Sequence, residues 1–164
     1  MASTLVSIAF AAILTGAAAV NAESHTIRFD NQCGFGNATL VLDGTIQKLI
    51  NNSYTKNDNI SGIAYLQDGR CNFNGENCTL MEMTLENAHC PGCGSSTDIS
   101  LISPHALNVP TAFSYYNGCD GQGAACNTPD CSTAFFKSDD NQVQVACEVD
   151  DVSTALPIVI MPNL

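Results

Sequence analysis

The residues whose types and spacing are best suited to chemistry are two cysteines separated by a proline and a glycine, Cys90-Pro91-Gly92-Cys93, with His89 directly before them. A dithiol at this spacing gives up two electrons when it closes to a disulfide, and the disulfide can be reduced again. A protonated His89 would favour the thiolate form of Cys90. The competing interpretation is a static structural disulfide, which an oxidising compartment favours. Zinc binding is disfavoured, because no second cysteine pair has a matched spacing.

The cysteine content of the whole chain predicts a disulfide framework. Nine cysteines occur in 164 residues, and a small exported domain with such a content is held together by disulfides. Each disulfide restricts the unfolded chain and so favours the folded one. Because nine is an odd number, the framework cannot pair every cysteine within the chain.

The N-terminal segment predicts export. Residues 5–19 are almost wholly apolar, and Val20-Asn21-Ala22 has the pattern of a signal-peptidase site, although no Lys or Arg precedes the apolar run. The alternative is a membrane anchor, but the run is shorter than the roughly 20 residues that span a bilayer. We therefore expect residues 1–22 to be a cleaved signal peptide and residues 23–164 to form a single secreted domain that leaves the membrane after cleavage.

Acidic residues dominate the charge of the chain, with sixteen carboxylates against five cations. A surface of this kind repels nucleic acid and anionic lipid, so neither is expected as a partner. The acidity is suited to solubility outside the cell, and the alternative interpretation is a patch that attracts metal cations. Four sequons also predict N-linked glycans in surface segments, at Asn37, Asn51, Asn59 and Asn77.

The elements that must position these residues are short strands, indicated by alternating polar and apolar residues. The clearest are 25–29, 39–42, 63–66, 81–86, 98–102, 112–116 and 142–147, with a last buried strand within 155–164. In the segment 81–86, Met81, Met83 and Leu85 face one way as core, and Glu82 and Thr84 face the other way. Polar residues in 51–61 predict a surface loop. His25 is expected to face solvent and His105 to lie in a turn. The whole pattern predicts an all-β sandwich.

Several motifs carry a family resemblance. The central stretch contains Asp98-Ile99-Ser100-Leu101, Asn108-Val109-Pro110, Phe113 and Gly118-Cys119, and it resembles the thaumatin family. More closely, residues from about 24 to 151 resemble the short secreted fungal proteins labelled "glycopeptide", a small branch of that family. The motifs are Asn31-x-Cys33-Gly34-Phe35-Gly36, Ile63-Ala64-Tyr65-Leu66-Gln67, Cys71-x-Phe73-Asn74-Gly75-Glu76, Tyr116-Asn117-Gly118-Cys119-Asp120-Gly121 and Gln142-Val143-Gln144-Val145-Ala146-Cys147. The resemblance implies a small, disulfide-stabilised, thaumatin-like β-sandwich.

The resemblance also implies a disulfide pairing. It pairs Cys119 with Cys147, makes local pairs of Cys71 with Cys78 and of Cys126 with Cys131, and leaves Cys90 and Cys93 to each other. In that family the first cysteine pairs with one close to the C-terminus. Residues 153–164 contain no cysteine, so the resemblance leaves the pairing of Cys33 open.

The first function that the resemblance implies is extracellular iron chemistry. The glycopeptide proteins are associated with wood decay, in which ferric iron is bound and reduced and hydroxyl radicals then form from oxygen and peroxide. Cys90 and Cys93 would supply the electrons, which is at most a redox activity. Ferric iron favours oxygen ligands, so carboxylates together with Tyr115 and Tyr116 are its candidate ligands, with iron as the one expected metal.

The competing function is non-catalytic binding of β-glucan or another cell-wall polysaccharide, in defence or host interaction, by a protein expected to be a monomer. Larger thaumatin-like proteins carry an acidic cleft associated with β-glucan binding. Asp98 matches one acid of that cleft, while Ser103 stands where the family often has another. Asp98 has a structural alternative as a carboxylate at a strand edge. Glycoside hydrolysis needs two carboxyl groups about 5–10 Å apart, one of them protonated, and is not expected here.

Overall fold

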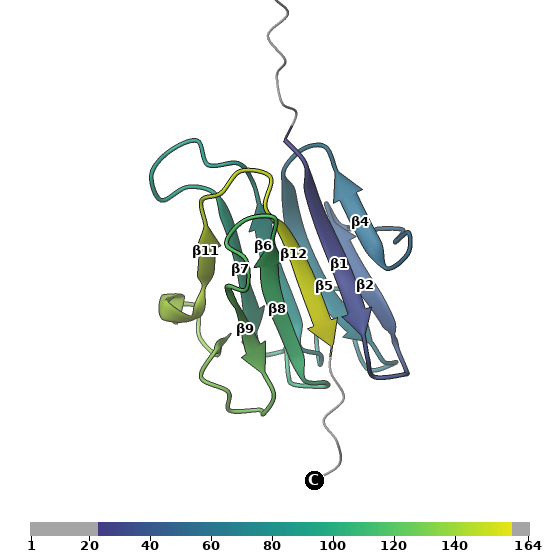
Figure 1. Cartoon of the computed structure of the whole chain (residues 1–164). Helices are drawn as coiled ribbons and strands as arrows, with labels where there is room; N and C mark the ends of the chain where they lie inside the picture. The colour runs from purple at the N-terminus through teal and green to yellow at the C-terminus, as the bar shows by residue number, and fades with distance from the viewer. Residues whose placement is uncertain (1–22, 159–164) are drawn as a thin grey trace, which may run out of the picture.

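Two β-sheets packed face to face form the protein in the computed structural model, which describes residues 23–158 (Figure 1). The predicted signal peptide, residues 1–22, and the predicted end of the last strand, residues 159–164, lie outside the described residues. Within them the helical structure is one short 3₁₀ turn, η1 (Asn141–Val143), and no helix has the length and apolar character to cross a membrane. The prediction of an all-β sandwich is confirmed.

Five strands form the first sheet, sheet A, which lies in front in Figure 1. Its order is β4 (Ser53–Lys56), β1 (His25–Asn31), β12 (Ser153–Ile158), β8 (Thr111–Tyr116) and β9 (Gly123–Cys126). The first and last strands of the described chain, β1 and β12, run parallel to each other, and the other neighbours are antiparallel.

Sheet B has seven strands and is mostly antiparallel. Its order is β10 (Ala134–Phe135), β7 (Ser95–Ser100), β6 (Leu80–Leu85), β5 (Ile60–Gln67), β2 (Asn37–Leu42) and β3 (Thr45–Ile46), and β11 (Val145–Cys147) also pairs with β7. The short strands β10 and β11 pair with different ends of β7, at residues 99–100 and 95–97 respectively. The centre of the sheet is therefore β5, β6 and β7, whose pairing fixes which side chains share a face.

The core lies between the sheets and follows the alternation seen in the sequence. In β6, Met81, Met83 and Leu85 are buried, whereas Glu82 and Thr84 are only partly covered. Met81 lies opposite Ile99 of β7. Sheet A contributes apolar side chains from β1, β8 and β12. Removing this apolar surface from water is the main force that holds the sheets together.

Four disulfides join described cysteines, so the predicted disulfide framework is confirmed. The pairs are those that the resemblance implies: Cys71–Cys78, Cys90–Cys93, Cys119–Cys147 and Cys126–Cys131. Cys119 follows β8 of sheet A and Cys147 ends β11 of sheet B, so their bond links the two sheets. Cys33 is buried beside Leu66 and Val109.

Three sequence-based expectations are wrong. The segment 51–61 contains strand β4, which pairs with β1; its residues are polar because β4 lies at the edge of sheet A. His25 is completely buried, because its ring contacts the Val152 carbonyl and Glu23. The predicted strand 142–147 is divided, with η1 ending at Val143 and β11 starting at Val145. The expectation for His105 is confirmed, because its backbone N–H donates to the Ile102 carbonyl and closes the turn at Ser103 and Pro104.

Candidate functional site

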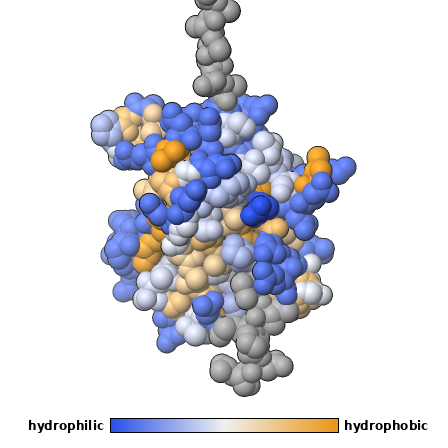
Figure 2. All heavy atoms as spheres, viewed as in Figure 1, coloured by the Kyte–Doolittle hydropathy of each residue, from blue (hydrophilic) through white to orange (hydrophobic). Residues whose placement is uncertain are grey.

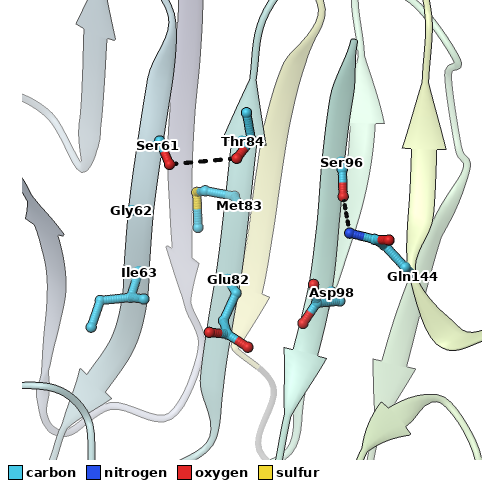
Figure 3. Close-up of a pocket in the computed structure, with 9 residues that line it drawn as sticks. All are labelled: Ser61, Gly62, Ile63, Glu82, Met83, Thr84, Ser96, Asp98 and Gln144. Atoms are coloured by element: carbon cyan, nitrogen blue, oxygen red, sulfur yellow. Dashed lines mark hydrogen bonds between the residues drawn. The ribbon is translucent and has the colours of Figure 1, made fainter. Parts of the chain in front are cut away.

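An open hollow on the outer face of sheet B is the best-formed candidate site (Figure 3). Its volume is about 420 Å³, within the range of about 300–1,000 Å³ typical of small-molecule sites. Strands β5, β6 and β7 form the floor, and the residue before β11 closes one side. The lining residues are Ser61, Gly62, Ile63, Glu82, Met83, Thr84, Ser96, Asp98 and Gln144.

An apolar cluster covers the part of this face that lies next to the hollow. The loop closed by Cys71–Cys78 follows β5, and Cys71 packs against the buried side chains of Val41, Tyr65 and Leu80. Ile63 packs against the same apolar cluster and so marks the border of the hollow. Beyond this border the outward side chains are small and polar, which leaves the face open.

Glu82 and Asp98 are the charged pair of the site. They lie directly opposite each other on β6 and β7, and Figure 3 shows their carboxyl groups side by side on the same face. Such opposite residues have Cβ atoms about 4.5–5.5 Å apart. Two ionised carboxylates this close repel each other, so the geometry favours a proton on one of them.

Asp98 is the member of the pair that holds the proton. Only 7% of its surface is exposed, and its buried Oδ1 has no hydrogen-bond partner among the described residues. Burial, and to a smaller extent the charge of Glu82, raises the pKa of Asp98 to about 7. Below that pH Asp98 is neutral, and Glu82, which is only partly buried, is the more accessible carboxyl group of the hollow.

Hydroxyl and amide groups surround the carboxyl pair. Ser61 Oγ and Thr84 Oγ1 are 3.4 Å apart, and Gln144 Nε2 donates to Ser96 Oγ (Figure 3). The nine lining residues include neither an aromatic ring nor a Lys or Arg side chain. The site therefore offers a ligand hydrogen bonds and one negative charge, rather than a stacking platform.

The sequence predicts a functional role for Asp98 but not for Glu82. The alternation places Glu82 correctly on the outward face of its strand, but it does not show which residue of the next strand lies opposite Glu82. Pairing the segments 81–86 and 98–102 as adjacent antiparallel strands in the right register would have identified it. Ser103 lies in an exposed turn and is not among the lining residues.

The second place where reactive side chains meet is the loop between β6 and β7, which projects from the top of Figure 1. It carries Cys90 and Cys93, and with His89 their ligand atoms lie within 4.8 Å of one another. His89 and Cys90 are exposed. Cys90 and Cys93 form a disulfide, and its sulfurs are not thiolate metal ligands until the bond is reduced. None of the three residues lines the hollow.

A further cluster of potential ligands, Asp68, Cys71 and Cys78, has a structural role. The two cysteines are bonded to each other. The carboxylate of Asp68 accepts hydrogen bonds from Arg70 and Asn108, and chiefly the bond from Arg70 lowers its pKa. Its oxygens are thus already engaged in holding the loop to the sheet.

The two tyrosines expected as ferric ligands face opposite sides of β8. Tyr115 is 1% exposed, lies in the core and donates its hydroxyl to the Val145 carbonyl. Burial raises its pKa to about 12, so it does not offer a phenolate to an external ion, and the expectation for Tyr115 is wrong. Tyr116 lies on the outer face of sheet A, where Arg28 covers its ring.

The four predicted glycan acceptors, Asn37, Asn51, Asn59 and Asn77, are all exposed.

Compared with known protein families and with curated proteins, the chain matches no family model and no curated protein.

Proposed function

We propose that this is a secreted protein that binds a neutral polysaccharide of the β-glucan type in the hollow on sheet B. The single observation that carries the proposal is the Glu82–Asp98 pair, set among hydroxyl groups in an open hollow. Four disulfides favour an oxidising compartment outside the cytosol. The thaumatin-like resemblance of the central strands points to the same ligand class.

The chemistry of the pair is suited to binding a sugar. Sugar hydroxyls are donors, and an accessible carboxylate such as Glu82 accepts charge-assisted hydrogen bonds, which are about twice as strong as neutral ones. Ser61 and Thr84 hydroxyls both donate and accept. Asp98 is almost covered, so it lacks the access that a general acid needs to reach a glycosidic oxygen. The site therefore supports binding and not hydrolysis.

Binding to insoluble polysaccharide tests this proposal. Purified protein should sediment with β-1,3-glucan, and Glu82→Gln should weaken the affinity at least about tenfold, the scale of a lost hydrogen bond to a charged group. Asp139→Asn is the matched control, because Asp139 is exposed and lies outside the hollow. Equal binding by Glu82→Gln and the unaltered protein would contradict the proposal.

A second candidate function, reduction of ferric iron, is supported by the exposed group formed by His89, Cys90 and Cys93. In the reduced protein the two thiols would each lose a proton and one electron as the disulfide forms, and two ferric ions would become ferrous. Each further cycle requires an external electron donor to reduce the disulfide. In this function iron is the substrate.

A stoichiometric assay tests the second candidate. Protein reduced with a dithiol and freed of it should convert about two ferric ions per Cys90–Cys93 pair, detected with a ferrous chelator. The Cys90→Ser, Cys93→Ser double variant should lose this capacity. Cys126→Ser, Cys131→Ser is the matched control, since it removes another local disulfide of the domain. Equal iron reduction by both double variants would reject a specific role for the loop.

A further inference from the structure

A second hollow lies on the opposite side of the sandwich, on the outer face of sheet A. It measures about 400 Å³ and is lined by Arg28, Asp30, Ser114, Ala155 and Pro157, together with Phe29. Figure 2 views this face, where a pale and tan area of small and moderately apolar residues lies between hydrophilic borders. The floor is shallow because Ala155 of β12 lies between Arg28 of β1 and Ser114 of β8.

Arg28 is held in an unusual way for such an acidic protein. Its guanidinium carbon lies 5.3 Å from the centre of the Tyr116 ring, so the side chain reaches across β12 to β8. Arg70 and Lys56 instead pair with neighbouring carboxylates, Asp68 and Asp58. In the part of the chain that the structure describes, no ion pair joins Arg28 to a carboxylate.

The aromatic ring fixes the guanidinium without using its donors. The face of an aromatic ring attracts a cation that lies over it. The five N–H groups of a guanidinium instead point outward within its plane, so stacking on the ring does not engage them. Arg28 thus keeps its donors for a group that enters the hollow. The group with the matching planar geometry is a carboxylate, which such a fork binds in a bidentate manner.

The far end of the hollow restricts the ligand further. Asp30 lies two residues after Arg28 on the same face of β1 and accepts a hydrogen bond from Gln32 Nε2 at 2.8 Å. A ligand that fills the hollow must therefore carry its carboxylate at the Arg28 end and hydrogen-bond donors toward Asp30. Ser114 adds a hydroxyl to the floor, while Ala155 and Pro157 offer C–H surface to a ring.

We propose that this hollow is a binding site for an acidic sugar, a uronic-acid residue of a polysaccharide. Its carboxylate pairs with Arg28 over Tyr116, its ring lies on Ala155 and Pro157, and its hydroxyls donate to Asp30. An inorganic anion would use Arg28 alone and would leave Asp30 and the C–H surface of Ala155 and Pro157 without a partner. The site is independent of Glu82 and Asp98, which lie on the other sheet.

Titration with a short oligogalacturonide, followed by calorimetry and by the side-chain Nε–H resonance of Arg28, tests the proposal. The oligogalacturonide should bind and shift that resonance, whereas acetate and a neutral galactose oligomer should bind at least tenfold more weakly. Arg28→Gln should lower the affinity at least tenfold, and Tyr116→Leu several-fold. Lys137→Gln removes an exposed cation away from the hollow and should leave the affinity unchanged, as should Glu82→Gln.

Each contrary result overturns the proposal. An unshifted Arg28 resonance in the unaltered protein, or unchanged affinity in Arg28→Gln, would mean that the arginine does not hold the ligand. Equal binding of acetate or of the neutral oligomer would reject a sugar acid as the ligand. Equal losses of affinity in Arg28→Gln and Lys137→Gln would show that only the overall charge of the protein matters. Loss of uronate binding in Glu82→Gln would place the ligand on sheet B. If the protein does not bind β-glucan but Arg28→Gln still weakens uronate binding, the β-glucan proposal fails and the proposal for this site stands.

Discussion

Glu82 and Asp98 lie directly opposite each other across β6 and β7, with their carboxyl groups on the outer face of sheet B. One of the two is nearly covered and the other is only partly covered. Because the charge of Glu82 adds to burial in raising the pKa of Asp98 to about 7, the protonation of Asp98 depends on Glu82 and changes near neutral pH. This coupling makes the hollow sensitive to pH.

The free energy of unfolding should decrease as the pH rises from about 4 to about 7. The folded-state pKa of Asp98 is about 7, above the value of 3.8 for an unperturbed aspartic acid, so the folded protein holds a proton that the unfolded chain has lost. Asp98→Asn should remove this decrease and stabilise the protein at pH 7 by about 1–4 kcal/mol, at about 1.4 kcal/mol for each pKa unit. Urea denaturation at several pH values measures the difference.

Glu82→Gln provides a second test of the same pair. Removing the neighbouring charge should lower the pKa of Asp98, although burial, the larger cause, still keeps it above 3.8. The carboxyl resonance of Asp98, followed by NMR during a pH titration, reports this directly. A titration that is the same with and without Glu82 would show that the two carboxyl groups do not interact.

The Cys119–Cys147 disulfide, which links the two sheets, should stabilise the protein more than the local Cys126–Cys131 disulfide. Cys119 and Cys147 are 28 residues apart, whereas Cys126 and Cys131 are five apart. Loop-closure entropy then gives about 3–4 kcal/mol for the longer loop and about 2 kcal/mol for the shorter. Replacing each pair with alanines and comparing the denaturation midpoints tests this ranking, and a larger loss for the shorter loop would contradict it.

His25 should be essential to the stability of the domain although it lies near the predicted start of the mature chain. Its Nδ1 is 2.6 Å from the Val152 carbonyl oxygen, and its Nε2 is 2.9 Å from Glu23 Oε1, which also accepts the Asn87 N–H. His25→Ala should destabilise the protein by about 2–4 kcal/mol, because it leaves a cavity and a buried carbonyl without its donor. The exposed His89→Ala is the control, with an expected change within about 0.5 kcal/mol.

The glycan predicted at Asn77 should be attached only before Cys71 and Cys78 join. In the folded protein Cys78 is completely buried, and Thr79, the third sequon residue, is 1% exposed and donates its hydroxyl to the Val109 carbonyl. An oligosaccharyltransferase supplied with its lipid-linked donor should modify Asn77 in the reduced, unfolded chain but not in the folded, oxidised protein. Glycopeptide mass spectrometry distinguishes the two results, and efficient transfer to folded protein would contradict the prediction.

The strands of the core could be predicted from the sequence because their alternation is strong. Met81 and Met83 are buried and Thr84 is only partly covered, as a period of two residues predicts. Strand β4 could not be predicted in this way, because it has only four residues, Tyr54 alone among them packs against the core, and its pairing with β1 is a tertiary interaction. Burial of His25 was missed for a similar reason, since its hydrogen-bond partner Val152 is 127 residues away.

Only one of the two carboxyl groups of the candidate site could be predicted from the sequence. Asp98 was selected through a family resemblance, whereas Glu82 becomes a site residue only through the register of β6 against β7. Tyr115 and Tyr116 were expected to bind iron together, although neighbouring residues of a strand face opposite sides. Which of the two is buried depends on how sheet A packs on sheet B. The hollow around Arg28 depends on three strands that are far apart in the chain.

The parallel neighbours β1 and β12 have a consequence for biosynthesis. Without β12, sheet A is two separate pieces, the pair β4–β1 and the pair β8–β9. The ribosome must therefore release β12 before the earliest strand gains its second neighbour in sheet A, and such distant pairing is slow. A truncated product lacking residues 153–158 should remain bound to chaperones, so folding of sheet A waits for the synthesis of β12.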